Sequence, residues 1–336
     1  MSHFPVSSSN LSAAHLGSYL KDQYNIEGNV HCSLLRAGVN HTYLLGCGDE
    51  RFVFRVYSLN WRTRPEIEEE IKLVRYLKEK AIPVSYAIPD RNGNHIQVLN
   101  APEGERLGVL FSIAEGDKLH NYPEELHSAV GAIMANMHLV TENLEIERTD
   151  YTWDVFLVDP FKHIRKFISA DSEEMQFLER TAKWLSKQLS DADASKLRKG
   201  VVHLDIWFDN LNITESGKIT LFDFDFCGNG FLCLDVAYYV LQLYHVERDE
   251  ETRDKKLAAF FKGYEFIVPL SPEEKRILPM LGVALYIFYL GVQSNRYENW
   301  SNSFLSESYL KRFISQLVKR YYDLHGLGKE REMADG

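Results

Sequence analysis

Three side chains that carry oxygen atoms occur within one short stretch of the second half of the chain. Asp205 and Asn210 belong, with His203, to an H-x-D-x-x-x-x-N pattern in VVHLDIWFDNLNI, and Asp223 ends the next strand-like run, KITLFDF. Composition gives a chance expectation of about 0.03 occurrences for the first pattern alone. Asp and Asn ordinarily form turns in loops. Their combination in a loop bounded by strands favours a chemical role.

The residue types match the needs of phosphoryl transfer. An enzyme of this kind holds metal-bound phosphates in line with a hydroxyl group and accepts the proton of that hydroxyl. Asp205 is the candidate base, and Asn210 and Asp223 offer the hard oxygen ligands that Mg²⁺ prefers. His203 is expected to pack beneath the loop and to hydrogen-bond backbone atoms. Asp225 could touch a second metal ion, but we interpret it as a polar group near the site.

The first part of the chain offers a cation for the phosphates. Arg55 lies in the strand-like run RFVFRVY, and Glu70, on a helix predicted from Pro65 to Lys80, could orient it. A guanidinium is permanently charged and can bind phosphate through two N–H groups. A surface cation on an edge strand is the alternative for Arg55, and a solvated helix face is the alternative for Glu70.

Two kinds of hydrophobic periodicity divide the chain. After a helix predicted from Leu11 to Tyr24, strand-like runs alternate with turns up to Ser112. From Pro123 onward the apolar spacing is helical, apart from a strand pair between Val201 and Phe226. The pattern predicts an α+β fold. A small lobe has a five-stranded antiparallel sheet and one inserted helix, and a larger helical lobe carries the catalytic hairpin. The five runs are VHCSLL, HTYLLG, RFVFRVY, HIQVLN and LGVLFS.

Charge and composition argue against several classes of protein. The 336 residues include 38 Lys and Arg against 48 Asp and Glu, which gives a net charge of −10. A protein that binds the phosphates of nucleic acid needs a basic face, so no nucleic-acid partner is expected. The 4 cysteines form no C-x-x-C pair and no zinc-site spacing, and we expect reduced thiols.

No secretion signal or membrane span is expected. The first ten residues lack Lys and Arg and lead into no long apolar core, unlike a secretory signal. The most apolar stretch, Ile277 to Val292, contains Pro279 and falls short of the ~20 apolar residues that a span requires. It is predicted to be a buried helix, and the protein is predicted to be cytoplasmic.

The motifs resemble those of the aminoglycoside phosphotransferase and choline kinase superfamily, over nearly the whole chain. HLDIWFDN is similar to that family's catalytic loop, and LFDFDFCG is similar to its metal-binding strand end. The resemblance implies Asp205 as catalytic base, Asn210 and Asp223 as Mg²⁺ ligands, and ATP as phosphate donor. Leu204 stands where the family usually has a small residue, and Trp207-Phe208 where it usually has a His-Pro pair.

The resemblance extends to the sheet lobe. It implies that Arg55, in place of the more familiar Lys, contacts the α- and β-phosphates. RAGVNHTY resembles a nucleotide-covering loop in which Gly38 would give backbone freedom and Asn40 a polar cap, although an ordinary hairpin turn explains it equally well. LGVLFSIAEG resembles the connector between lobes, where backbone groups from Ser112 to Ala114 would meet adenine.

Asp235, in CLDVAYYV, is similar to a family Asp at a helix start, which implies that it caps that helix and braces the catalytic loop. An aromatic cluster follows later in the chain. Helical spacing makes it mostly core, although an acceptor pocket would look similar. Its members are Tyr286, Phe288, Tyr289, Tyr297, Trp300 and Phe304.

The resemblance implies a bilobal protein-kinase-like fold, with a nucleotide-binding lobe in residues 1–113 and a catalytic and acceptor lobe in residues 114–336. The leading hypothesis is an ATP- and Mg²⁺-dependent kinase acting on a hydroxyl of a small molecule, most similar to the homoserine-kinase-like and stress-response-kinase-like branches. One alternative is a protein Ser/Thr kinase of the stress-response type, although H-R-D and A-P-E segments are missing. The other is a nucleotide-binding pseudokinase. No motif identifies the acceptor or the oligomeric state.

Overall fold

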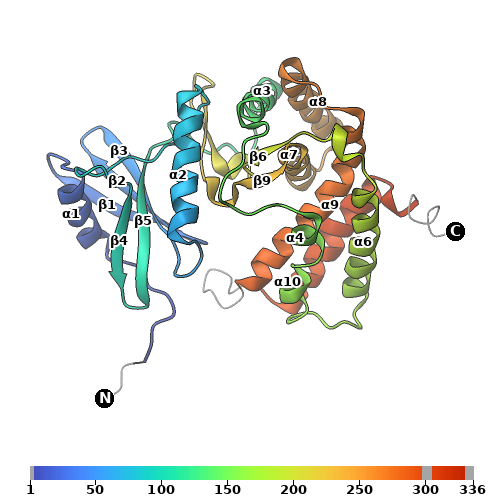
Figure 1. Cartoon of the computed structure of the whole chain (residues 1–336), viewed down its shortest axis with the longest axis horizontal. Helices are drawn as coiled ribbons and strands as arrows, with labels where there is room; N and C mark the ends of the chain where they lie inside the picture. Colours follow the sequence, from blue (N-terminus) through green and yellow to red (C-terminus); the bar gives the residue numbers. More distant parts are fainter. Residues whose placement is uncertain (1–3, 297–304, 330–336) are drawn as a thin grey trace. The chain divides into compact units, whose positions relative to one another are not determined.

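The computed structural model describes residues 4–296 and 305–329 of the chain. Their contacts divide the chain into two compact units (Figure 1). The sheet unit runs to Asp117 and includes Leu211–Phe224, and the helical unit holds Lys118–Asn210 and the chain from Asp225 onward. The predicted α+β class is confirmed.

The sheet unit contains five strands that pair antiparallel, as predicted, and their order in the sheet is β1-β2-β3-β5-β4. Gly48, in the turn between the second and third strands, has a φ of 58°, a conformation that glycine adopts without steric cost. The strands are β1 (Val30–Ala37), β2 (His41–Cys47), β3 (Glu50–Val56), β4 (Ile96–Ala101) and β5 (Gly104–Ser112).

Two helices cover the two faces of this sheet (Figure 1). They are α1 (Ala13–Gln23) and α2 (Arg64–Glu79). Leu16 of α1 joins a core cluster with Phe54 and Val56, whereas Ile67 of α2 packs in a second cluster on the other face. Successive residues of a strand point to opposite faces. Arg55, between Phe54 and Val56, therefore lies on the α2 side.

A hairpin of β7 (Leu211–Ile213) and β8 (Ile219–Leu221) follows the candidate catalytic loop, as predicted. The prediction placed it in the helical lobe, but its contacts group it with the sheet unit. The reason is backbone pairing, because the Leu221 carbonyl accepts the Ser85 N–H at 2.9 Å and the Leu221 N–H donates to the Pro83 carbonyl at 2.8 Å. The limit between separate domains after residue 113 stays a prediction.

Helices make up most of the helical unit. The long ones are α3 (Glu124–Thr141), α6 (Glu173–Ser190), α7 (Cys233–Val246), α8 (Glu250–Ile267) and α9 (Pro272–Asn295). The short ones are α4 (Trp153–Leu157), α5 (Phe161–Ile164), α10 (Glu307–Phe313) and α11 (Arg320–Leu324), with a π-helical turn at Ile314–Lys319. Two further strands, β6 (Lys199–Val202) and β9 (Gly228–Phe231), pair antiparallel. They lie directly before His203 and shortly after Asp225 in the sequence. Strands this short show no clear alternation, and the pair was not predicted.

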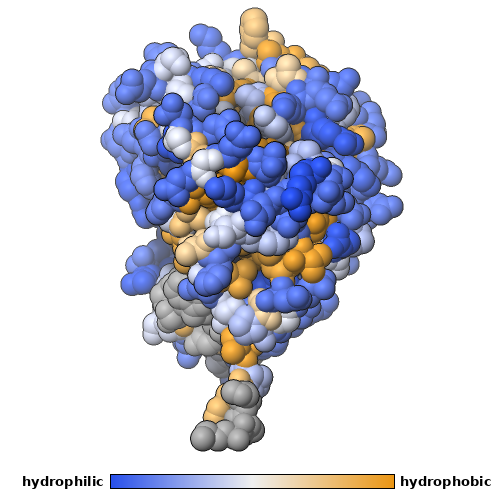
Figure 2. Space-filling model, turned by 90° about the vertical axis from the view of Figure 1, so that its left-hand side faces the viewer, coloured by the Kyte–Doolittle hydropathy of each residue, from blue (hydrophilic) through white to orange (hydrophobic). Residues whose placement is uncertain are grey.

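The apolar stretch from Ile277 to Val292 forms most of α9. Within the ranges that the structure describes, α9 alone is long and apolar enough to cross a membrane, and 78% of its most apolar window is buried inside the protein. The prediction of a buried helix is therefore confirmed. The face shown in Figure 2 is mostly hydrophilic, with smaller apolar areas between the polar side chains.

Helices α3 and α8 pack so closely that a methyl group does not fit between them. A Cβ atom at Gly263 would lie 1.9 Å from the Ser128 carbonyl oxygen, and one at Gly131 would lie 2.2 Å from the Phe260 carbonyl oxygen. We expect Gly263→Ala to lower the free energy of unfolding by about 1–3 kcal/mol, measured by chemical denaturation. Gly46→Ala is the control, because a Cβ atom there has nothing within 4 Å. Equal stability of the two variants would contradict this packing.

Candidate active site

The loop from His203 to Asn210 is held in a strained backbone conformation. Leu204 has a φ of 65° although it is not glycine, and its side chain is buried. Such a conformation costs of order 1–3 kcal/mol and persists only where surrounding contacts enforce it. Here the Asp235 carboxylate accepts the N–H groups of His203 and Leu204 at 2.9 and 2.6 Å, and the Tyr289 hydroxyl donates to the Leu204 carbonyl at 2.6 Å. Side chains of α7 and α9 therefore fix the loop.

Asp235 is fully buried in the first turn of α7. The helix starts after Leu232 without a side-chain cap, so the predicted capping role of Asp235 is wrong. Its carboxylate faces the loop backbone instead, and it also lies 3.1 Å from Nε2 of His138. His138 in turn is hydrogen-bonded through Nδ1 to the Tyr264 hydroxyl at 2.7 Å. Asp235 thus connects the loop to α3 and α8.

Both carboxylate oxygens of Asp205 accept hydrogen bonds within the helical unit. Nδ2 of Asn210 donates to Oδ2 at 2.7 Å, and the Tyr238 hydroxyl donates to Oδ1. Because the Asn210 nitrogen is directed at Asp205, the amide oxygen is the ligand atom that Asn210 can offer to a metal ion. The Asp205 N–H donates to Nδ1 of His203 at 3.2 Å, and His203 is buried. His203 therefore supports the loop from the protein interior, through a hydrogen bond to the Asp205 backbone.

Sequence reasoning missed Tyr238. Burial and the negative charge of Asp205 raise the pKa of Tyr238 well above its ordinary value, so its hydroxyl stays protonated and donates. The sequence did contain a signal for it. Tyr238 follows Asp235 by three residues, and side chains three apart share a helix face, so both could be expected to face the loop.

In the sheet unit, Arg55 joins two carboxylates. Its Nη1 lies 2.8 Å from Oε1 of Glu70, and its Nη2 lies 3.0 Å from Oδ1 of Asp223. Glu70 is fully buried and also accepts the Tyr57 hydroxyl at 2.9 Å. Burying a carboxylate is costly unless it is paired and hydrogen-bonded. Arg55 lies on an inner strand with its side chain 10% exposed, so it is not a surface cation on an edge strand. Glu70 is not on a solvated helix face, because it is fully buried.

Asp223 and Asp225 differ in their surroundings. Asp223 follows β8 with a φ of 66°, and 41% of its side chain is exposed, so a metal ion can reach its carboxylate. Asp225 is buried, and its backbone carbonyl accepts from Nη2 of Arg148. Burial lowers the pKa of Arg296 to about 10, and the Asp225 charge opposes this shift. The burial of Asp225 favours its interpretation as an interior polar group.

The loop between β1 and β2 is a tight turn. The Gly38 N–H donates to the Asn40 carbonyl at 3.0 Å, and Oδ1 of Asn40 accepts the Ser58 N–H at 3.3 Å. Gly38 does not adopt a positive φ, so the backbone freedom expected there is not used. Asn40 fixes the turn to the end of β3, and a role for either residue toward a nucleotide stays a prediction.

The connector after β5 uses some of its backbone groups internally. The Ser112 N–H donates to the Tyr86 carbonyl at 2.9 Å, and the Ser112 carbonyl accepts the Ser85 hydroxyl at 2.6 Å. The Ala114 carbonyl accepts Nδ2 of Asn212 at 2.6 Å. A carbonyl can accept a second bond. Adenine could therefore still bond to these carbonyls, but not to the Ser112 N–H.

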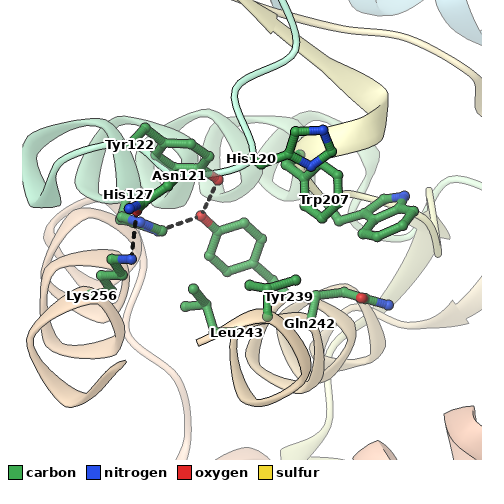
Figure 3. A pocket seen from close by; sticks show the side chains of 11 residues that line it. His120, Asn121, Tyr122, His127, Trp207, Tyr239, Gln242, Leu243 and Lys256 are labelled. Atoms are coloured by element: carbon green, nitrogen blue, oxygen red, sulfur yellow. Dashed lines mark hydrogen bonds between the residues drawn. The ribbon is translucent and has the colours of Figure 1, made fainter. Parts of the chain in front are cut away.

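A small cavity lies beside the Trp207-Phe208 part of the loop (Figure 3). Its volume of about 20 Å³ has room for one water molecule. The Tyr239 hydroxyl is hydrogen-bonded to the Tyr122 hydroxyl at 2.7 Å and to Nδ1 of His127 at 2.8 Å. In this structure the cavity is too small for an acceptor. Of the aromatic cluster predicted as core or acceptor pocket, Tyr286 is buried, and Tyr297, Trp300 and Phe304 lie outside the described residues.

His127 makes stability depend on pH. Burial, with a smaller contribution from Lys256, lowers the pKa of His127 to about 4 from 6.5. The unfolded chain binds this proton below pH 6.5 and the folded chain only near pH 4, so this contribution to stability is lost as the pH falls through that window. Because of this difference, the free energy of unfolding falls by up to about 1.4 kcal/mol for each unit of pH decrease within the window. We expect His127→Gln to lose less stability between pH 7 and pH 5 in urea denaturation. An equal loss in both proteins would contradict the assignment.

The sequence is similar to those of a known protein family and of individual proteins. The profile of the phosphotransferase enzyme family matches residues 31–270, a range that contains every candidate site residue from Gly38 to Asp235. A homoserine kinase of Methylobacillus glycogenes is 25% identical over 261 residues, which are 76% of this chain and 77% of that protein.

Solved structures share the fold. A microcompartment-associated aminopropanol kinase superposes with a TM-score of 0.76 at 20% identity, over 94% of this chain and 99% of the other. An amicoumacin kinase in complex with AMP-PNP and Ca²⁺ gives a TM-score of 0.74 at 18% identity, over 94% and 97%. At these identities the likeness concerns the fold, and the predicted protein-kinase-like fold is thereby confirmed.

Proposed function

Since the chain belongs to the phosphotransferase enzyme family, we propose that it transfers the γ-phosphate of ATP to a hydroxyl group of a small molecule, with Mg²⁺ as the metal. The observation that carries the proposal is the Asp205 carboxylate, which lies partly exposed on a loop whose backbone is fixed at Leu204. A base must be placed this firmly to accept a proton from an oriented hydroxyl.

The residues fit a nucleotide-bound Mg²⁺ ion. Such an ion takes one or two protein oxygen ligands and completes its shell with phosphates and water. The amide oxygen of Asn210 and the exposed carboxylate of Asp223 are two donors of this kind. When bound, the metal neutralises negative charge on the phosphates. Arg55 would contact the phosphates, and Asp205 would accept the proton of the acceptor hydroxyl.

We propose an amino alcohol as the acceptor class to test first. A relative is a homoserine kinase, and a structure with the same fold is an aminopropanol kinase. Homoserine and aminopropanol both carry one hydroxyl and one amino group. The net charge of −10 suits a cationic acceptor, although the charge of a whole chain does not define one pocket.

The test is phosphate transfer from γ-labelled ATP to a panel of acceptors. The panel comprises homoserine, aminopropanol, choline, an aminoglycoside and a mixture of Ser- and Thr-containing peptides, each with and without Mg²⁺. The proposal expects label on one small molecule and only with the metal. Label on the peptides alone would make the protein a protein kinase. A thermal shift by ATP that needs no metal and is accompanied by no hydrolysis would make it a nucleotide-binding module.

A further inference from the structure

We propose that Tyr238 is a positioning residue that holds the Asp205 carboxylate in one orientation for proton acceptance, an inference that rests on the proposed function. The Tyr238 hydroxyl donates to Oδ1 of Asp205 across 33 residues of sequence. Nothing in the motif around Asp205 points to this contact. It arises because α7 carries two residues that contact the loop. Asp235 fixes the loop backbone, and Tyr238 contacts the Asp205 carboxylate.

The carboxylate of Asp205 is bonded at both ends. Tyr238 donates to Oδ1, and Asn210 donates to Oδ2 at 2.7 Å. Rotation of an Asp carboxylate about its last side-chain bond is otherwise broad. Two donors on different oxygens select one plane for the carboxylate that accepts the proton of a substrate hydroxyl. Without Tyr238, Oδ1 of Asp205 would lose the donor that selects this plane together with Asn210.

Packing keeps Tyr238 in place. The residue is 3% exposed, and its ring lies 5.3 Å from the ring of Tyr289, measured between centroids. Tyr289 itself is bonded to the Leu204 carbonyl. The two tyrosines, from α7 and α9, therefore form one packed pair that contacts both the carboxylate and the strained backbone of the loop. In the described part of the helical unit, the titratable side chains that hydrogen-bond this loop include Lys118, His203, Asp235, Tyr238 and Tyr289.

The next residue provides a matched control. Tyr239 is as buried as Tyr238 and lies on the same helix, but its hydroxyl is bonded to Tyr122 and His127 (Figure 3). Tyr239→Phe removes a buried hydroxyl with two partners, neither of which belongs to the loop. A role of Tyr238 in stability alone would make the two phenylalanine variants behave alike.

The experiment compares the wild-type protein, Tyr238→Phe and Tyr239→Phe in two assays. The first is the pH profile of kcat with the acceptor found in the panel. In Tyr238→Phe we expect kcat to fall about tenfold, and we expect the acidic limb to move to higher pH, because a carboxylate that loses a donor holds its proton more tightly. Tyr239→Phe should keep the wild-type profile, even where its Tm falls.

The second assay needs no turnover. Crystal structures of the same proteins give the orientation of the Asp205 carboxylate plane. A plane turned from its wild-type orientation in Tyr238→Phe alone supports the proposal, and the same orientation in all three proteins overturns it. If the wild-type protein phosphorylates no acceptor, the proposed function fails, whereas the orientation of the plane still decides whether Tyr238 positions the carboxylate.

Discussion

Replacing Asp205 by asparagine is expected to lower kcat for phosphotransfer by about 10³-fold, within the range that a positioned general base contributes. The amide has nearly the shape of the carboxylate, so the loop should keep its fold. It cannot accept the proton of a hydroxyl. ATP with Mg²⁺ should still raise Tm, because the proposed phosphate and metal contacts are made by other residues. Steady-state kinetics and thermal denaturation measure the two effects.

The same loop supplies the control. Asp209 lies four residues further on, and its carboxylate pairs with Lys118 at 2.7 Å, near the surface. Surface ion pairs contribute about 0–1 kcal/mol. Asp209→Asn should therefore leave kcat within about twofold of the wild type. If Asp205→Asn kept more than a tenth of wild-type turnover, Asp205 would not be the base.

Removing the Arg55 side chain is expected to cost about 3–5 kcal/mol of stability, because Glu70 would be left as a buried charge without its cation. Glu70 is fully buried, and the Tyr57 hydroxyl would still donate to it. Arg55→Ala should also weaken ATP binding, since its guanidinium is the proposed phosphate contact. Urea denaturation measures the first effect, and isothermal titration with ATP and Mg²⁺ measures the second.

A double variant separates these two effects. Buried ion pairs can often be replaced by apolar residues of similar volume without loss of stability. Arg55→Met with Glu70→Leu should therefore recover most of the stability that Arg55→Ala loses, and ATP affinity should stay low. Wild-type affinity for ATP in the double variant would remove Arg55 from the nucleotide site. Wild-type stability of Arg55→Ala would show that the ion pair of Arg55 with Glu70 contributes little to the free energy of unfolding.

Local patterns explain why much of the fold could be predicted from the sequence. Burial alternates along β2 and β4, whereas the runs around Phe54 in β3 and Leu110 in β5 are buried on both faces and were found from their apolar, β-branched and aromatic composition. The loop that contains Asp205 and Asn210 could be found because its chemistry depends on residues five positions apart. A turn before Asp223 gave the hairpin. In each case the information lies within about ten residues of sequence.

Long-range contacts account for what could not be predicted. The bond from Tyr238 to Asp205 joins residues 33 positions apart, and the pairing of Ser85 with Leu221 joins the hairpin to a segment far upstream. No periodicity in either segment encodes its partner. The helix-capping role expected of Asp235 failed, whereas its hydrogen bonds to the N–H groups of His203 and Leu204 agree with the expected bracing of the catalytic loop.

The central proposal is that Asn210 and Asp223 are both ligands of nucleotide-bound Mg²⁺. The most direct measurement is the Mg²⁺ concentration that half-saturates ATP binding in isothermal titration, for the wild type, Asn210→Ala and Asp223→Asn. We expect each variant to need at least about tenfold more Mg²⁺, because the loss of even an outer-shell partner costs about 10–100-fold in metal affinity, while binding without Mg²⁺ stays the same. Wild-type Mg²⁺ dependence in either variant would contradict the claim.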